Sequence, residues 1–485
     1  MLPPKQNLFA RLSVAHRRAI TSSRLHQSPP LSLAADKCRS MDQLRQVHAQ
    51  MITTAQIHDA FAASRLINFA ALSDSGDLSY ALKLFANIPA PNTFIWNTLI
   101  RAHATSSNPA AGLHLYSEMR RLAAAPGKHT FPFVLKACAN SQSAKCSEQI
   151  HAHVLKFGLD CDSHVANGLI RAYSVAGMMG DARNVFDEMR DRYVSVWTTI
   201  ICGYAQNNSA EEAIALFSAM VSEGFEPSGV VLASVLSACA QSACLWLGKE
   251  IHAYIDDKGV EMDVILGTAL INMYAKNGEL IEARQIFDGL RERNVATWNA
   301  MICGLALHGC AGEAIDLFAE MGRGRVRPNG ITLLGVLCAC CHAGLVDFGR
   351  EVFYSMERLY GVEPNLRHYG CMVDLLGRGG RILEAEGLIR GMRWEADVAI
   401  WGALLSGCRS WGDIEVAERV VGVIQGLDPT NHGVHVVLSN MYAEAGRWED
   451  VVSRRKAIKE ESLNKTAGWS AVDGDRNNKT ADVFV

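Results

Sequence analysis

The chain has 485 residues, of which 49% are hydrophobic and 20% are charged, and its formal net charge at pH 7 is −3. No apolar run approaches the ~18 residues that a membrane-spanning helix needs, which argues against a membrane protein. The near-neutral charge argues against nucleic-acid binding through phosphate contacts alone, because such binding requires a clear excess of Lys and Arg.

Residues 1–30 differ in composition from the rest of the chain. They contain five Lys or Arg residues and several Ser, and the first acidic residue is Asp36. Leu8, Leu12 and Ala15 fall on one side of a possible helix. An arginine-rich, acid-free, amphipathic start is typical of an organelle transit peptide, and the arginine content favours the mitochondrion over the chloroplast. An ordinary disordered tail is the alternative interpretation.

From Leu31 onward the sequence repeats itself. Trp96, Trp197 and Trp298 are 101 residues apart, and several Phe, His and Cys residues keep the same interval. Each period divides into segments of 35, 35 and 31 residues, and the segment 194–228 contains two apolar runs at helical spacing. A fixed period of this kind predicts an all-α fold, an α-solenoid of tandem helix-turn-helix hairpins that bury their apolar faces on one another.

The pattern continues with changes toward the C-terminus. The segments 330–365 and 366–397 each have one extra residue, and two less regular hairpins follow at 398–431 and 432–465. The last residues lose helical periodicity, which predicts a short hairpin or a frayed tail. The predicted organisation is a transit peptide (1–30), a repeat array (31–397), two extension hairpins (398–465) and a tail (466–485).

These segments resemble a known family. A 35-residue hairpin with W-N-x-L-I (Trp96–Ile100) and A-x-x-L-F-x-x-M (Ala213–Met220) resembles a pentatricopeptide repeat (PPR). The 35, 35 and 31 triplet resembles its plant-type PLS subclass, and the hairpins at 398–465 resemble its C-terminal E extension. Many relatives continue into a deaminase domain ending in Asp-Tyr-Trp, which this chain, ending at Val485, does not show. Tetratricopeptide repeats are the alternative, but the 31-residue segment does not fit them.

The resemblance implies a right-handed superhelix that binds single-stranded organellar RNA, with about one base read per repeat. Most often, such a protein selects a cytidine for conversion to uridine. We therefore predict a site-recognition factor for RNA editing that recruits a deaminase-bearing PPR protein or an editing accessory protein in trans, with no membrane or DNA partner. The alternatives are a factor for organellar RNA stability, splicing or translation and, more remotely, a helical scaffold that binds proteins.

The resemblance also implies which side chains read bases. In the family, the readers are the fifth residue of the hairpin, on its first helix, and the last residue of the hairpin. Because Asn and Thr also favour helix N-termini, capping is an alternative role for these residues. The predicted base-reading residues are Ser64, Asn92, Asn97, Asn167, Thr198, Ser228, Thr268, Asn294, Asn299, Asn329 and Asp397.

The predicted pairs differ in the base that the family pattern assigns to them. The pairs Ser64–Asn92 and Thr268–Asn294 match the adenine type. The pair Asn299–Asn329 matches a pyrimidine type, with cytosine preferred. Three other hairpins depart from the family pattern at a reading position, which leaves their selectivity open; the departing residues are Gly127, Tyr193 and Gly370.

The sequence predicts no enzyme, metal site or cofactor. A zinc cytidine deaminase needs a His or Cys ligand, a Glu two residues after it, and a Cys-x-x-Cys pair. None of the 16 histidines is followed by Glu at the second position. The Cys-x-x-Cys of Cys338 and Cys341 encloses Cys340, which keeps the 101-residue interval with Cys138 and Cys239. Cysteines fixed to a repeat position are expected to be small core residues.

Overall fold

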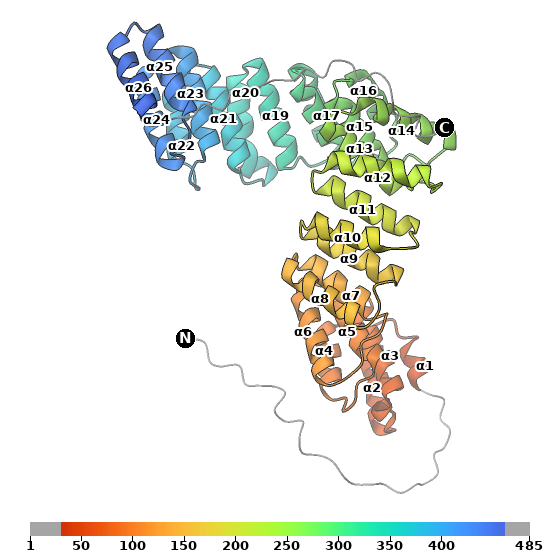
Figure 1. The fold of residues 1–485 in the computed structure, drawn as a ribbon. Helices are drawn as coiled ribbons and strands as arrows, with labels where there is room; N and C mark the ends of the chain where they lie inside the picture. The colour runs from red at the N-terminus through yellow and green to blue at the C-terminus, as the bar shows by residue number, and fades with distance from the viewer. Residues whose placement is uncertain (1–30, 461–485) are drawn as a thin grey trace, which may run out of the picture. The chain divides into compact units, whose positions relative to one another are not determined.

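The computed structural model describes residues 31–460, with side chains described to residue 456. All regular elements in this range are helices, and Figure 1 shows them as pairs that follow one another along the chain. The described helices form two compact units, which divide between Leu159 and Asp160. None of these helices is long and apolar enough to cross a membrane. The predicted transit peptide (1–30) and tail (466–485) lie outside the described residues.

The first unit begins with α1 (Leu31–Ala35), α2 (Met41–Thr53) and a short 3-10 helix (Gln56–His58). Three helical hairpins follow. They are α3 (Ala60–Leu72) with α4 (Leu78–Ala86), α5 (Thr93–Thr105) with α6 (Ala110–Arg121), and α7 (Phe131–Asn140) with α8 (Ala144–Lys156).

The second unit consists of nine described hairpins. The prediction of an all-α array of tandem hairpins is therefore confirmed. The hairpins are α9 (Ser163–Val175) with α10 (Met179–Glu188), α11 (Val194–Gln206) with α12 (Ala210–Ser222), α13 (Gly229–Ser242) with α14 (Leu245–Lys258), α15 (Val264–Lys276) with α16 (Leu280–Gly289), α17 (Val295–Leu307) with α18 (Ala311–Arg323), α19 (Gly330–Ala343) with α20 (Val346–Ser355), α21 (Leu366–Arg378) with α22 (Ile382–Arg390), α23 (Val398–Trp411) with α24 (Ile414–Leu427), and α25 (Gly433–Glu444) with α26 (Trp448–Glu460).

Within each unit, the first helix of a hairpin packs against the first helix of the next. In the first unit α5 contacts both α3 and α7, and in the second unit the same contact continues from α9 to α25. Second helices contact the first helix of their own hairpin and that of the following one, as α12 contacts α11 and α13. The first helices therefore form a continuous layer in each unit, and the second helices cover one side of it.

Polar N-caps set the starts of the first helices. At eight of them, the residue before the helix accepts a hydrogen bond from a backbone N–H of the first turn, which satisfies a donor that has no partner inside the helix. The helix α7 begins three residues into its segment, with Pro132 in its first turn, where the missing N–H of proline costs nothing. The eight capping residues are Asp59, Asn92, Asp162, Asp263, Asn294, Asn329, Asn365 and Asp397.

The tryptophans that reveal the 101-residue period are core residues. Trp197 is 1% exposed and packs edge to face on Phe186, with 4.7 Å between the ring centres. The pairs Phe85–Trp96 and Phe287–Trp298 have the same geometry, at 4.7 and 4.9 Å. In each case, a second helix supplies the Phe and the next first helix supplies the Trp. The same aromatic contact therefore joins one hairpin to the next three times along the chain.

The extra residue of the segment 330–365 has a structural counterpart. The helix α20 ends at Ser355 and continues directly into a π-helical turn, Met356–Tyr360. A π turn accommodates one additional residue within a helix. The insertion thus stays inside the second helix, and the next first helix still begins at Leu366, directly after its N-cap Asn365.

Candidate functional site

Each predicted reading pair involves two neighbouring first helices. The fifth residue of a hairpin lies in its first helix, and the last residue is the N-cap of the next first helix. Hydrogen bonds bring two of the predicted pairs together, Thr268 with Asn294 and Asn299 with Asn329. Among the described residues, no hydrogen bond joins the members of the other predicted pairs.

The pair Asn299–Asn329 is directly bonded. The side-chain Nδ2 of Asn299 donates to Oδ1 of Asn329 at 3.1 Å. The hydroxyl of Thr332 donates to Oδ1 of Asn299 at 2.6 Å, and the backbone N–H of Thr332 donates to Oδ1 of Asn329 at 3.1 Å. Asn299 is 6% exposed and Thr332 is fully buried, whereas Asn329 is exposed. The pair is thus anchored from the buried side and open at Asn329.

The pair Thr268–Asn294 is connected through a third residue. The Oγ1 atoms of Thr268 and Thr297 are 2.8 Å apart, and Oγ1 of Thr297 is 3.1 Å from Oδ1 of Asn294. Thr268 also bonds to the carbonyl of Val264 at 2.6 Å. Thr297 is fully buried, Thr268 is half-buried and Asn294 is exposed. In both bonded pairs, therefore, the connecting threonine is the third residue of the following hairpin.

The other fifth residues are less favourably placed. Ser64 is 3% exposed and its hydroxyl donates to the carbonyl of its own helix at Phe61, so it is poorly accessible to a ligand. Thr198 is half-buried and also bonds within its helix. In Asn97 and Asn167, Oδ1 is buried and has no hydrogen-bond partner among the described residues. Their geometry contrasts with that of Asn299, whose Oδ1 is bonded.

The last residues divide into those that cap and those that do not. Asn92 and Asp397 accept from the backbone N–H of Ile95 and Ile400, at 3.0 and 2.9 Å. Ser228 is exposed and makes no side-chain cap. The capping alternative is thus confirmed as a role of most last residues, although capping occupies the carbonyl oxygen of an Asn and leaves its amide N–H groups to donate.

The structure adds a row of residues that the sequence analysis did not single out. The second residue of several first helices is apolar and projects into solvent, next to the pair positions. An exposed apolar row at one repeat position indicates a binding surface rather than scattered surface residues. In the sequence, the signal is an apolar residue that stands three positions before the fifth residue of its segment, as Phe94 stands before Asn97. These second residues are Phe61 and Phe94 in the first unit and Val230, Ile265 and Ile331 in the second, and they are 50–67% exposed.

The repeated cysteines are mostly structural. Cys138, Cys239 and Cys340 are fully buried, which confirms the prediction that they are core residues. Cys303 is half-buried, and burial raises the pKa of its thiol to about 11. The Sγ of Cys338 lies 3.5 Å from that of a cysteine on the neighbouring first helix, Cys371. In the part of the chain that the structure describes, no group of three or more His, Cys, Asp or Glu residues is placed to hold a metal ion.

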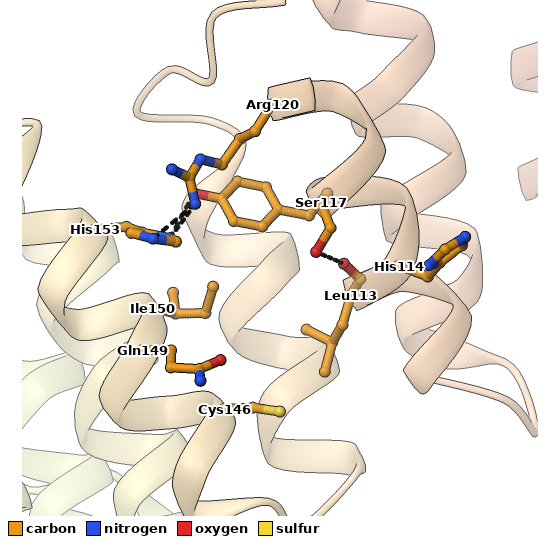
Figure 2. A pocket seen from close by; sticks show the side chains of 9 residues that line it. Leu113, His114, Ser117, Arg120, Cys146, Gln149, Ile150 and His153 are labelled. Carbon is orange, nitrogen blue, oxygen red and sulfur yellow. Dashed lines mark hydrogen bonds between the residues drawn. The ribbon is translucent and has the colours of Figure 1, made fainter. Parts of the chain in front are cut away.

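A small cavity of about 210 Å³ lies between the second helices α6 and α8 (Figure 2). Arg120 donates to Nε2 of His153 at 2.7 Å, and the hydroxyl of Tyr116 is 3.3 Å from Nδ1. A ring nitrogen that accepts from a guanidinium must be unprotonated, and burial, followed by the charge of Arg120, lowers the pKa of His153. The cavity is lined by second helices, whereas the candidate readers stand on first helices, so it is not part of the candidate site.

His368 is expected to make the stability of the array depend on pH. The ring is 1% exposed, its Nδ1 accepts from the N–H of Asn365, and its Nε2 is 2.8 Å from the carbonyl of Gly330. Burial lowers the pKa of His368, partly opposed by the bond to Gly330. The unfolded chain therefore binds a proton that the folded chain excludes, and stability present above pH ~6.5 is lost as the pH falls below it.

The measurement is the thermal unfolding midpoint between pH 7.5 and pH 5, which we expect to decrease. The matched variant is H368T, because the equivalent Thr332 makes the same capping box at α19. H368T should show a smaller decrease than the parent protein. An equal decrease in both proteins would assign the pH dependence to other buried histidines.

Family models match most of the array. The model described as "PPR repeat" matches residues 165–194, 195–225, 268–295, 331–360 and 367–395. The "PPR repeat family" model matches residues 91–140 and 293–342. The "E motif" model matches residues 411–473, beginning at the end of α23 and continuing beyond the described residues.

Relatives of known family are pentatricopeptide repeat proteins, and a solved structure has a similar fold. Pentatricopeptide repeat-containing protein At5g56310 of Arabidopsis thaliana is 38% identical, over 89% of this chain and 88% of that protein. The chloroplastic/mitochondrial protein At1g59720 of the same plant is 39% identical, over 90% and 71%. The crystal structure of the pentatricopeptide repeat protein PPR10 in complex with an 18-nt psaJ RNA element aligns with a TM-score of 0.67 at 18% identity. That alignment covers 87% of this chain and 65% of PPR10, and at this identity it supports the fold.

Proposed function

The chain belongs to the pentatricopeptide repeat family, and from this premise we propose that it binds single-stranded RNA with base selectivity along the layer of its first helices. The observation that carries the proposal is the combination, within one hairpin, of an exposed apolar residue and a polar pair. A base stacked on Ile265 would present its Watson–Crick edge to Thr268 and Asn294. The hairpin 60–92 has the same combination, with the exposed Phe61 as its second residue and Ser64–Asn92 as its pair.

The proposal is compatible with the near-neutral charge of the chain. Stacking on aliphatic or aromatic side chains and hydrogen bonding to base edges need no large positive field. From the family pattern, we assign adenine to the pair Thr268–Asn294 and a pyrimidine, preferably cytosine, to Asn299–Asn329. A wrong base at one working pair would weaken binding by about 1–3 kcal/mol, by analogy with base readout in general.

We further propose that the bound RNA is an organellar transcript and that the protein selects a cytidine for conversion to uridine. The match to the E motif supports this role, and the name of the relative At1g59720 supports an organelle, for which we propose the mitochondrion. Deamination is assigned to a separate protein in trans. The hairpins α23–α26 expose Trp411 and Trp448, which are 61% and 64% accessible and suit a protein-docking surface.

Two measurements test these proposals separately. Sequencing of organellar transcripts in plants without the protein should reveal at least one cytidine that is no longer converted, and re-expression should restore it. If every site stays edited while a transcript is shortened or remains unspliced, the protein acts in RNA stability or splicing. Purified protein should also enrich one sequence from a pool of randomised single-stranded RNA at moderate salt. Absence of any enriched sequence would favour a scaffold that binds proteins.

A further inference from the structure

Thr297 and Thr332 stand at the same position, the third residue of a hairpin, and each connects the reading pair of the preceding hairpin. The family pattern assigns base reading to the fifth and last residues, and neither threonine is among them. Both threonines are fully buried, so neither can contact a base. Both make hydrogen bonds to side chains of the pair that precedes them.

The protons around Thr332 determine how the amide of Asn299 is oriented. Oγ1 of Thr332 accepts from the backbone N–H of Asn329 at 3.1 Å, and its one proton is assigned to Oδ1 of Asn299, which at 2.6 Å is closer than Oδ1 of Asn329 at 3.1 Å. The Nδ2 of Asn299 then donates to Oδ1 of Asn329. Turning this amide over would place two carbonyl oxygens against each other, which is unfavourable. In the observed orientation, Oδ1 of Asn329 already accepts from Asn299 and from Thr332, so the exposed Asn329 has its N–H groups to offer to a ligand.

We propose that Thr332, at the third position of the following hairpin, is a positioning residue for base selectivity at the hairpin 295–329. Its hydroxyl fixes the amide of the fifth-residue Asn so that the pair presents hydrogen-bond donors and therefore selects a base edge that carries acceptors. This inference rests on the proposed RNA-binding function and deepens it. Two hairpins with the same fifth residue can then differ in base selectivity because of one side chain in the hairpin that follows each of them.

The hairpin 163–193 provides the natural contrast. It also has Asn at the fifth position, Asn167, but the third residue of the following hairpin is Val196, which is fully buried and has no hydroxyl. Correspondingly, Oδ1 of Asn167 is buried without a hydrogen-bond partner among the described residues. Nothing there distinguishes the two orientations of the amide. The base facing Asn167 should therefore be selected less sharply than the base facing Asn299.

The test compares base preferences in a randomised single-stranded RNA pool bound by the full chain and by single variants. T332V removes the hydroxyl at nearly constant volume. It should reduce discrimination at the base facing the hairpin 295–329 by about tenfold, the factor that corresponds to 1.4 kcal/mol. T332S keeps the hydroxyl and should restore the preference. V196T supplies a hydroxyl beside Asn167 and should sharpen the preference at the base that faces it.

The matched control is T130V, at the third position of the hairpin 128–162. The hydroxyl of Thr130 accepts from the backbone N–H of Gly127 at 3.0 Å, and Oδ1 of Asn97 in the preceding hairpin has no hydrogen-bond partner among the described residues. T130V should leave base preferences unchanged, and thermal unfolding midpoints of all variants separate a loss of fold from a loss of selectivity. If the parent protein enriches a sequence and folded T332V retains the same preference, the inference is wrong. If the parent enriches no sequence, the RNA-binding proposal fails, and the inference fails with it.

Discussion

Replacement of Trp197 by alanine is expected to destabilise the centre of the array by about 3–5 kcal/mol, the range for removing a large buried aromatic side chain. Trp197 is 1% exposed and packs on Phe186, so W197A removes the aromatic contact between α10 and α11 and leaves a cavity. Because repeats are stabilised by their immediate neighbours, the loss should concentrate in residues 163–228. Hydrogen exchange by mass spectrometry should show lower protection there, and the thermal midpoint should fall.

Two further variants test whether the loss in W197A comes from the buried aromatic packing. The indole nitrogen of Trp197 is buried without a hydrogen-bond partner in the described range, so W197F removes an unsatisfied donor while keeping an aromatic ring. W197F should therefore cost clearly less than W197A. W448A, at a tryptophan that is 64% exposed, should change stability by no more than about 0.5 kcal/mol. Equal losses in W197A and W448A would show that burial at the hairpin junction is not what stabilises the array.

The fold was predictable from the sequence because local residues mark where most of the first helices begin. An Asn or Asp before an apolar run, as at Asn294 or Asp263, starts a first helix, and the repeated aromatic pairs fix the interval between helices. These signals are local, so they can be read without knowing how neighbouring hairpins pack. The helix starts at Ser163, Val264 and Val295 therefore coincide with the predicted starts of their segments.

The candidate site was only partly predictable, because accessibility and bonding depend on the neighbouring hairpin. Ser64 and Asn299 have the same repeat position and both are buried, yet Ser64 bonds to its own helix and Asn299 bonds across to Asn329. The difference depends on residues some 30 positions away, such as Thr332, which repeat spacing alone does not reveal. The exposed apolar second residues could not be predicted for a similar reason, since helical periodicity does not show which apolar residues remain exposed once neighbouring hairpins have packed.

The variant N299T is expected to change the preferred base at the hairpin 295–329 from a pyrimidine to adenine. It gives this hairpin the same set of fifth, last and following third residues as the hairpin 264–294, namely Thr, Asn and Thr. The second residue of this hairpin, Ala296, and the buried Thr332 stay unchanged. Binding of two RNAs that differ at this base alone should shift by about 1–3 kcal/mol in favour of adenine.

The reciprocal variant T268N is the matched control, because it should move the base facing the hairpin 264–294 from adenine toward a pyrimidine and leave its neighbour unchanged. In the double variant, the two preferences should exchange. N299T also removes the bond to Asn329. Weaker binding without a change in the preferred base would therefore reflect a loss of protein stability, and the thermal midpoint would reveal that loss. If both single variants fold and keep the original preferences, the fifth residues do not read bases. The polar pairs would then serve the array as helix caps and interhelical bonds.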